Sequence, residues 1–270
     1  MQSTRLRFDD YLAHLERESG RVADALAVAD PSAPVPTCPE WTVGDLADHL
    51  TEVQSFWATV VRGGLRTDAE VEAIRQPARP AQLIDKLGQL RAATFRLREA
   101  LEQTPPSRPA WTWSSEQTAG FIYRRQALEA AVHRVDAEIA VAERTAVAAD
   151  LATDGVDEGL RVMLGGCPEW GTQTPDDTRR LRIEATDTGA TWVVSAARFT
   201  GTAPDGTVYD EPDLVVAERD SGQRCQALVR GRAEDLLCWV WSRPTSGELE
   251  RSGDPQVLAD LGGLIDRPIT

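Results

Sequence analysis

The spacing of apolar residues changes near Ala146, and this change constrains the fold more than any other feature of the sequence. Before it, apolar residues recur at helical spacing in four long segments, whereas short runs of alternating or β-rich residues dominate after it. The chain has 270 residues, enough for two modest cores. We therefore expect an all-α domain over residues 1–146 and an α+β domain over residues 147–270.

The first half has the start and stop signals of a four-helix bundle. Thr42 is placed to cap the second helix, with Asp45 as the acidic residue of a capping box, and Ser114 or Ser115 is placed to cap the fourth. Proline-rich or glycine-containing stretches separate the segments. The predicted helices cover residues 6–28, 42–61, 83–101 and, from the Ser114 or Ser115 cap, about 115–143.

The second half is predicted to begin with a helix over residues 148–164 and to continue as a small sheet. Turn signals at Thr188-Gly189 and Ser221-Gly222 divide four β-rich runs, which suggests two hairpins. A further helix is expected over residues 233–241, and Asp254 is expected to begin a last short one. The predicted strands cover residues 179–186, 191–197, 213–219 and 225–231.

Composition excludes several classes of function. A formal charge of −14 would repel a phosphate backbone, so no nucleic acid is expected as a partner. No apolar run approaches the roughly 20 residues of a membrane helix, and residues 1–10 lack the apolar core of a signal peptide, so we expect a cytoplasmic protein. The four cysteines have no Cys-x-x-Cys spacing, which excludes a zinc ribbon or a redox motif.

One tetrapeptide occurs twice, as Cys38-Pro39-Glu40-Trp41 and as Cys167-Pro168-Glu169-Trp170. A capped helix is predicted to follow the first copy and a loop over residues 171–175 to follow the second. Because the flanking residues do not match, we interpret the recurrence as coincidence and not as a duplicated domain.

The chain has three histidines, and two of them lie within helical patterns beside acidic residues. Glu129 and His133 are four positions apart, which places both on one helix face where they can share an ion. His49, on the second helix, can supply a third ligand from a facing helix. Such a set suits Zn²⁺, while the ligand types leave Ni²⁺ and Fe²⁺ open.

The ordinary role of a Glu-x-x-x-His pair is a solvated helix-surface pair. Apolar neighbours on both sides favour a partly buried pair here, which would need a compensating partner. Asp136 and Asp45, each about one turn from a histidine, could orient an imidazole, although both could instead cap or solvate their helices. His14, on the first helix, is expected to have a solvated or packing role.

Three segments carry a family resemblance: residues 35–50 (VPTCPEWTVGDLADHL), 124–138 (RRQALEAAVHRVDAE) and 227–243 (ALVRGRAEDLLCWVWSR). They resemble the mycothiol-dependent maleylpyruvate isomerase family over nearly the whole chain. The resemblance implies a DinB-like four-helix bundle that binds a divalent metal, zinc, through His49, Glu129 and His133. It also implies a smaller C-terminal α/β domain similar to sterol-carrier proteins.

Mycothiol is the thiol of actinobacteria, and the presence of a single lysine, Lys86, among 29 basic residues fits a GC-rich host of that kind. The resemblance implies an isomerase or S-transferase in which a metal-bound thiolate attacks an electrophilic small molecule, since coordination lowers a thiol's pKa. Arg243 resembles a family arginine that could bind a carboxylate in catalysis, although a simple helix-end charge is an equal alternative. Many members have a histidine where this chain has Leu128, a difference that leaves the ligands intact but could change the wall of the site.

Two other classes of function also fit these residues. The bundle could be a non-catalytic binding protein with a structural metal, or the metal could activate water for hydrolysis without a thiol. The oligomeric state, monomer or homodimer, is open.

Overall fold

The computed structural model describes residues 4–218, 222 and 224–269, with the backbone alone of Asp177. The chain forms two compact units, one over Arg5–Ala146 and the other from Val147 onward. Within the described residues, none of the helices is both long enough and apolar enough to cross a membrane.

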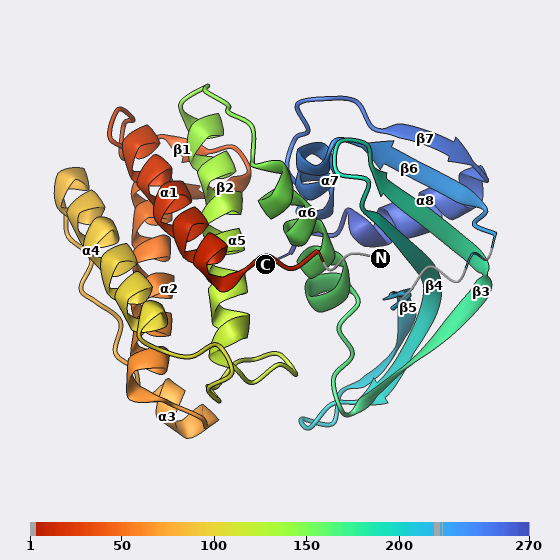
Figure 1. The fold of residues 1–270 in the computed structure, drawn as a ribbon, viewed down its shortest axis with the longest axis horizontal. Helices are drawn as coiled ribbons and strands as arrows, with labels where there is room; N and C mark the ends of the chain where they lie inside the picture. The colour runs from red at the N-terminus through yellow and green to blue at the C-terminus, as the bar shows by residue number, and fades with distance from the viewer. Residues whose placement is uncertain (1–3, 219–221, 223, 270) are drawn as a thin grey trace. The chain divides into compact units, whose positions relative to one another are not determined.

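Four long helices lie side by side in the first unit and form the predicted bundle (Figure 1). Its core is built from the apolar stripes that the sequence pattern indicated, including the fully buried Val22, Leu26, Leu46, Leu50 and Leu90. The bundle helices are α1 (Phe8–Leu26), α2 (Val43–Gly63), α4 (Leu83–Glu102) and α5 (Ala119–Ala140).

The start of α2 is fixed by the predicted capping box. Thr42 Oγ1 accepts a hydrogen bond from Asp45 N (3.2 Å), and Asp45 Oδ2 accepts one from Thr42 N (3.0 Å). His49 lies within the second turn of the helix that begins here, so the cap also fixes where this side chain emerges.

The predicted cap of α5 was wrong: Thr118 caps this helix, and neither Ser114 nor Ser115 does. Thr118 Oγ1 accepts from Phe121 N (3.3 Å), whereas Ser114 Oγ accepts from Glu116 N (3.2 Å) within the preceding loop. The short helix α3 (Asp68–Glu72) was not predicted, although the capping box of Thr67 and Glu70 that begins it is a sequence signal.

A small hairpin precedes α2, where only a proline-rich connection was expected. It pairs β1 (Pro34–Val35) with β2 (Cys38–Thr42) in antiparallel register, and Val35 lies opposite Cys38. Pro36 and Thr37 are therefore the two residues of its turn. Prolines are rare inside strands, so the composition concealed this element.

The second unit contains a five-stranded sheet in the order β5-β4-β3-β6-β7. The predicted hairpin of β3 and β4 is confirmed, but the second hairpin was wrong: β5 pairs with β4, and β6 runs parallel to β3. Residues 171–175, predicted as a loop, belong to the first strand. The strands are β3 (Gly171–Ala185), β4 (Thr191–Thr202), β5 (Val208–Val216), β6 (Ala227–Gly231) and β7 (Glu250–Gly253).

Helices complete this unit. α6 (Ala149–Glu158) continues into the π-helix η1 (Gly159–Leu164), α7 (Ala233–Val240) packs against α6, and α8 (Pro255–Ile265) lies along the sheet (Figure 1). A Cβ atom on Gly159 would lie 2.4 Å from Val240 Cγ1, so this close approach of η1 and α7 requires glycine. Arg219 and Ser221, predicted in a strand and a turn, lie outside the described residues. The mixed α and α+β fold class is as expected.

We expect Thr118→Ala to lower the free energy of unfolding by about 1 kcal/mol, because α5 loses the side-chain acceptor at its first turn. Ser115→Ala, at an exposed position in the same loop, is the matched control and should change stability by less than about 0.5 kcal/mol. Urea unfolding of both variants measures the difference. Equal losses would contradict the assignment of the cap.

Candidate metal centre

The three predicted ligands converge between two helices of the bundle. His49 comes from α2, and Glu129 and His133 come from successive turns of α5. Glu129 Oε1 lies 3.1 Å from His49 Nε2 and 3.2 Å from His133 Nε2. One ligand atom from each residue therefore falls within 4.8 Å of the other two.

These separations fit a tetrahedral ion. Ligands about 2.0 to 2.1 Å from Zn²⁺ at the tetrahedral angle lie about 3.3 Å apart, close to the two distances around Glu129 Oε1. The two imidazole rings approach edge to face with centroids 4.8 Å apart, so both nitrogens can face one point. The donor set of two imidazoles and one carboxylate is that of many zinc enzymes.

The ligands are buried to different degrees, and the difference leaves one side open. The side chain of His49 is 29% exposed, that of Glu129 16% and that of His133 9%. An ion held by these three groups could therefore accept a small molecule as a further ligand from the solvent side.

The charges around the triad reinforce one another. Burial alone would raise the pKa of Glu129, but Arg125, His133 and His49 outweigh it and hold that pKa well below 4.5. Burial alone would lower the pKa of His133, but Glu129 and Asp136 outweigh it and raise that pKa from 6.5 to about 9. Without a metal, His133 therefore carries a proton on each nitrogen and donates to a carboxylate on either side.

Asp136 is the residue that contacts the far nitrogen of His133. His133 Nδ1 donates to Asp136 Oδ2 at 2.9 Å, and the aspartate side chain has no exposed surface. This is the orienting contact that the i+3 spacing suggested. Asp45 caps its helix instead, because its carboxylate belongs to the capping box of α2.

Two neighbours of the triad were not recognised in the sequence. Arg125 pairs with Glu129, and its position one turn earlier on α5 could have revealed this contact. The ring of Trp41 lies 4.5 Å from the ring of His49 and 5.8 Å from that of His133, between centroids. No local signal predicts the second contact, because the hairpin brings Trp41 there.

The remaining predicted residues have contacts of their own. Arg243 belongs to the second unit, where its Nη1 donates to Trp241 O (2.7 Å). His14 is buried on α1 and contacts Arg17, in keeping with a packing role. Leu128 is completely buried, so it does not form the exposed wall of the site.

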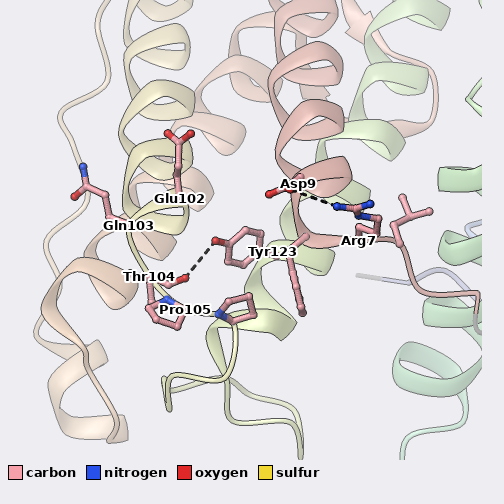
Figure 2. A pocket seen from close by; sticks show the side chains of 10 residues that line it. Arg7, Asp9, Glu102, Gln103, Thr104, Pro105 and Tyr123 are labelled. Carbon is pink, nitrogen blue, oxygen red and sulfur yellow. Dashed lines mark hydrogen bonds and ion pairs between the residues drawn. The ribbon is translucent and has the colours of Figure 1, made fainter.

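A cavity of about 680 Å³ lies at another place on the bundle (Figure 2). Phe8 and Asp9 from the start of α1, Glu102 from the end of α4 and Tyr123 from α5 line it. The hydroxyl of Tyr123 donates to Thr104 O at 3.2 Å. None of the three predicted ligands lines this cavity, which therefore does not mark the metal centre.

Comparison with known proteins identifies the family. Residues 12–138 match a family model described as "Mycothiol maleylpyruvate isomerase N-terminal domain", and residues 150–260 match the "MDMPI C-terminal domain". The chain belongs to the mycothiol-dependent maleylpyruvate isomerase family. The family recognised from the sequence is thus confirmed, and with it the expectation of an enzyme.

The solved structures support the fold of this isomerase family. A crystal structure of a mycothiol-dependent maleylpyruvate isomerase is similar with a TM-score of 0.59 at 12% identity, covering 94% of this chain and 97% of that one. A crystal structure of a histidine-to-alanine mutant of such an isomerase matches with the same values. No protein of curated function matches the chain by sequence.

We expect the affinity of the triad for Zn²⁺ to fall about tenfold for each pH unit below 9, because the ion must displace the proton that His133 holds up to that pH. Competition with a chromophoric chelator between about pH 7 and 9 measures the slope. Calorimetry in buffers of different ionisation enthalpy should detect the released proton. An affinity that is independent of pH would contradict the expectation.

Proposed function

We propose that the protein is a mycothiol-dependent isomerase or S-transferase whose zinc ion is held by His49, Glu129 and His133. We further propose that residues 1–146 form its metal-binding domain and residues 147–270 a second domain that supplies Arg243. The observation that carries the proposal is the convergence of three ligand atoms within 4.8 Å, on a side of the bundle that solvent reaches.

The bound ion would supply Lewis acidity that lowers the pKa of a coordinating thiol, so that its sulfur is nucleophilic at neutral pH. The protein's residues prepare for this chemistry. Asp136 keeps a proton on His133 Nδ1, so that Nε2 offers its lone pair to the ion. Arg125 balances the charge of Glu129, and the Trp41 ring packs beside the imidazole of His49.

The substrate is proposed to be a small electrophile. The structural relative is named for maleylpyruvate, an unsaturated dicarboxylate whose activated carbon a thiol can attack. Addition followed by elimination of the thiol isomerises such a substrate, whereas a stable adduct is an S-conjugate. Arg243 is proposed to bind a carboxylate of the substrate or of the thiol, through the bidentate geometry that guanidinium groups favour.

Mycothiol and maleylpyruvate, incubated with zinc-loaded protein, should give isomerised product or a conjugate detectable by mass spectrometry. We expect His49→Ala, Glu129→Gln and His133→Ala each to lower kcat/KM at least about 100-fold, since even groups that only orient metal ligands cost about 10 to 100-fold. His14→Gln, at the remaining histidine, is the control and should stay active.

The outcome separates the three classes of function. Turnover that does not require the thiol would favour a hydrolase that activates water. Zinc binding without turnover of any electrophile would favour a binding protein with a structural metal. Failure of the protein to bind any divalent ion, with the three ligand variants behaving like wild type, would exclude the proposal.

The role of Arg243 is tested separately. Arg243→Lys keeps the positive charge but loses the planar fork of donors, and we expect KM for the dicarboxylate to rise about tenfold or more. Arg251→Lys is the matched control, since Arg251 lies 5.7 Å from the centroid of the Trp239 ring and is given no role in binding. An unchanged KM in both variants would contradict the binding role of Arg243 and favour the alternative, a charge at the end of a helix.

A further inference from the structure

The hairpin of β1 and β2 brings two side chains to the carboxylate of Asp136. Thr37 Oγ1, in the turn, donates to Asp136 Oδ1 at 2.6 Å. Cys38, the first residue of β2, directs its Sγ at Asp136 Oδ2 from 3.7 Å. The same Oδ2 accepts the hydrogen bond from His133 Nδ1. A line of polar contacts thus runs from the turn of the hairpin to a predicted ligand.

A third side chain of this hairpin reaches the site from another direction. Trp41, near the end of β2, places its ring 4.5 Å from that of His49 and 5.8 Å from that of His133. His49 therefore contacts the hairpin through Trp41, and His133 contacts it through Trp41 and through Asp136. The next residue, Thr42, caps the helix that carries His49.

We infer that the β1–β2 hairpin is a positioning element of the metal site, and that Thr37 acts as a positioning residue for His133 through Asp136. The inference rests on the proposed metal centre but concerns different residues. It assigns a role to the segment of residues 34–42, which the ligand triad alone leaves without one.

The physical reason lies in the burial of Asp136. A carboxylate without exposed surface cannot be hydrated, so its orientation depends on the protein donors around it. The Thr37 hydroxyl holds Oδ1 and thereby fixes the rotation of the carboxylate that presents Oδ2 to His133. Loss of the hydroxyl leaves Oδ1 with one donor fewer and frees the group to turn, which weakens its hold on the imidazole.

The backbone of the hairpin has little conformational freedom. Pro34, Pro36 and Pro39 restrict its backbone, and Val35 anchors it in the core of the bundle with no exposed surface. A rigid support holds the imidazole in the ligating orientation before an ion arrives, so less freedom is lost on binding.

The second copy of the tetrapeptide offers a natural comparison. Cys167 is exposed, and its Sγ lies 3.7 Å from Pro168 O. Trp170 packs against Phe199 and Tyr209 with ring centroids 5.4 Å away in each case. These contacts lie within the second unit, so the tetrapeptide alone does not carry the proposed role.

The test compares Thr37→Val, which removes the hydroxyl but keeps the branched shape, with Thr37→Ser, which keeps the hydroxyl. We expect Thr37→Val to weaken Zn²⁺ binding about 10 to 100-fold and to shift the visible absorption of the Co²⁺-loaded protein. Thr37→Ser should stay close to wild type in both measurements. Cys38→Ala should weaken binding in the same direction, whereas Cys167→Ala should not.

Thermal unfolding of the metal-free variants distinguishes a merely structural role, which would lower the melting temperature without changing the Co²⁺ spectrum of the folded protein. Identical affinity and spectrum for wild type and Thr37→Val would overturn the inference while leaving the metal centre intact. A wild-type protein that binds no divalent ion would overturn both.

A measurement on the unmodified protein guards against a variant that fails to fold. The ¹⁵N shifts of the imidazoles in the zinc-loaded protein should assign to His133 a proton on Nδ1 and coordination through Nε2. The chain has three histidines, so the signals can be assigned with few variants. Coordination of His133 through Nδ1 would refute the proposed role of the hairpin.

Discussion

Both ring nitrogens of His133 face carboxylate oxygens. This arrangement is one case of a general feature of α5, which carries charged side chains although it is buried. The helix is buried over most of its length, although its sequence contains arginines, glutamates, an aspartate and a histidine. Charges removed from water need partners; some of these lie on α5 itself, and others come from neighbouring segments. Glu18 on α1 accepts from Arg134 (2.8 Å), His49 on α2 meets Glu129, and Thr37 in the hairpin meets Asp136. These pairings match α5 to its neighbours with a specificity that apolar packing alone does not give.

The helices of the bundle could be predicted because their signals are local. Apolar stripes recur every three or four residues, and the Thr42 and Asp45 capping box is contained in four residues. The sheet was harder, because pairing depends on distant residues. The residues around Leu214 and Val229 carry no local signal that β5 pairs with β4 or that β6 pairs in parallel with β3. The short strand β7 carries exposed residues throughout and has no apolar pattern to detect.

The same contrast applies to the candidate site. The spacing of Glu129 and His133 follows from helix geometry, and so does the approach of Asp136 one turn later. His49 lies on another helix, and local spacing does not show that α2 faces α5. The family resemblance supplied that step. The contacts of Thr37, Cys38 and Trp41 could not be read locally, because they depend on a hairpin whose prolines hide its strands. Identical residues at 167–170 have different neighbours, which shows that the tetrapeptide alone does not determine its role.

The exposure of the triad decreases from His49 through Glu129 to His133, and this order has a kinetic consequence. Water and chelators would therefore reach the α2 side of an ion held here before they reach the α5 side. If an ion is held by this triad, its bond to His49 would be the first to break when the ion leaves and the last to form when it enters. The two ligands on α5, with the support of the hairpin behind them, would form a half-site that captures the ion. The rate of metal exchange would then depend on access to the His49 side of the site.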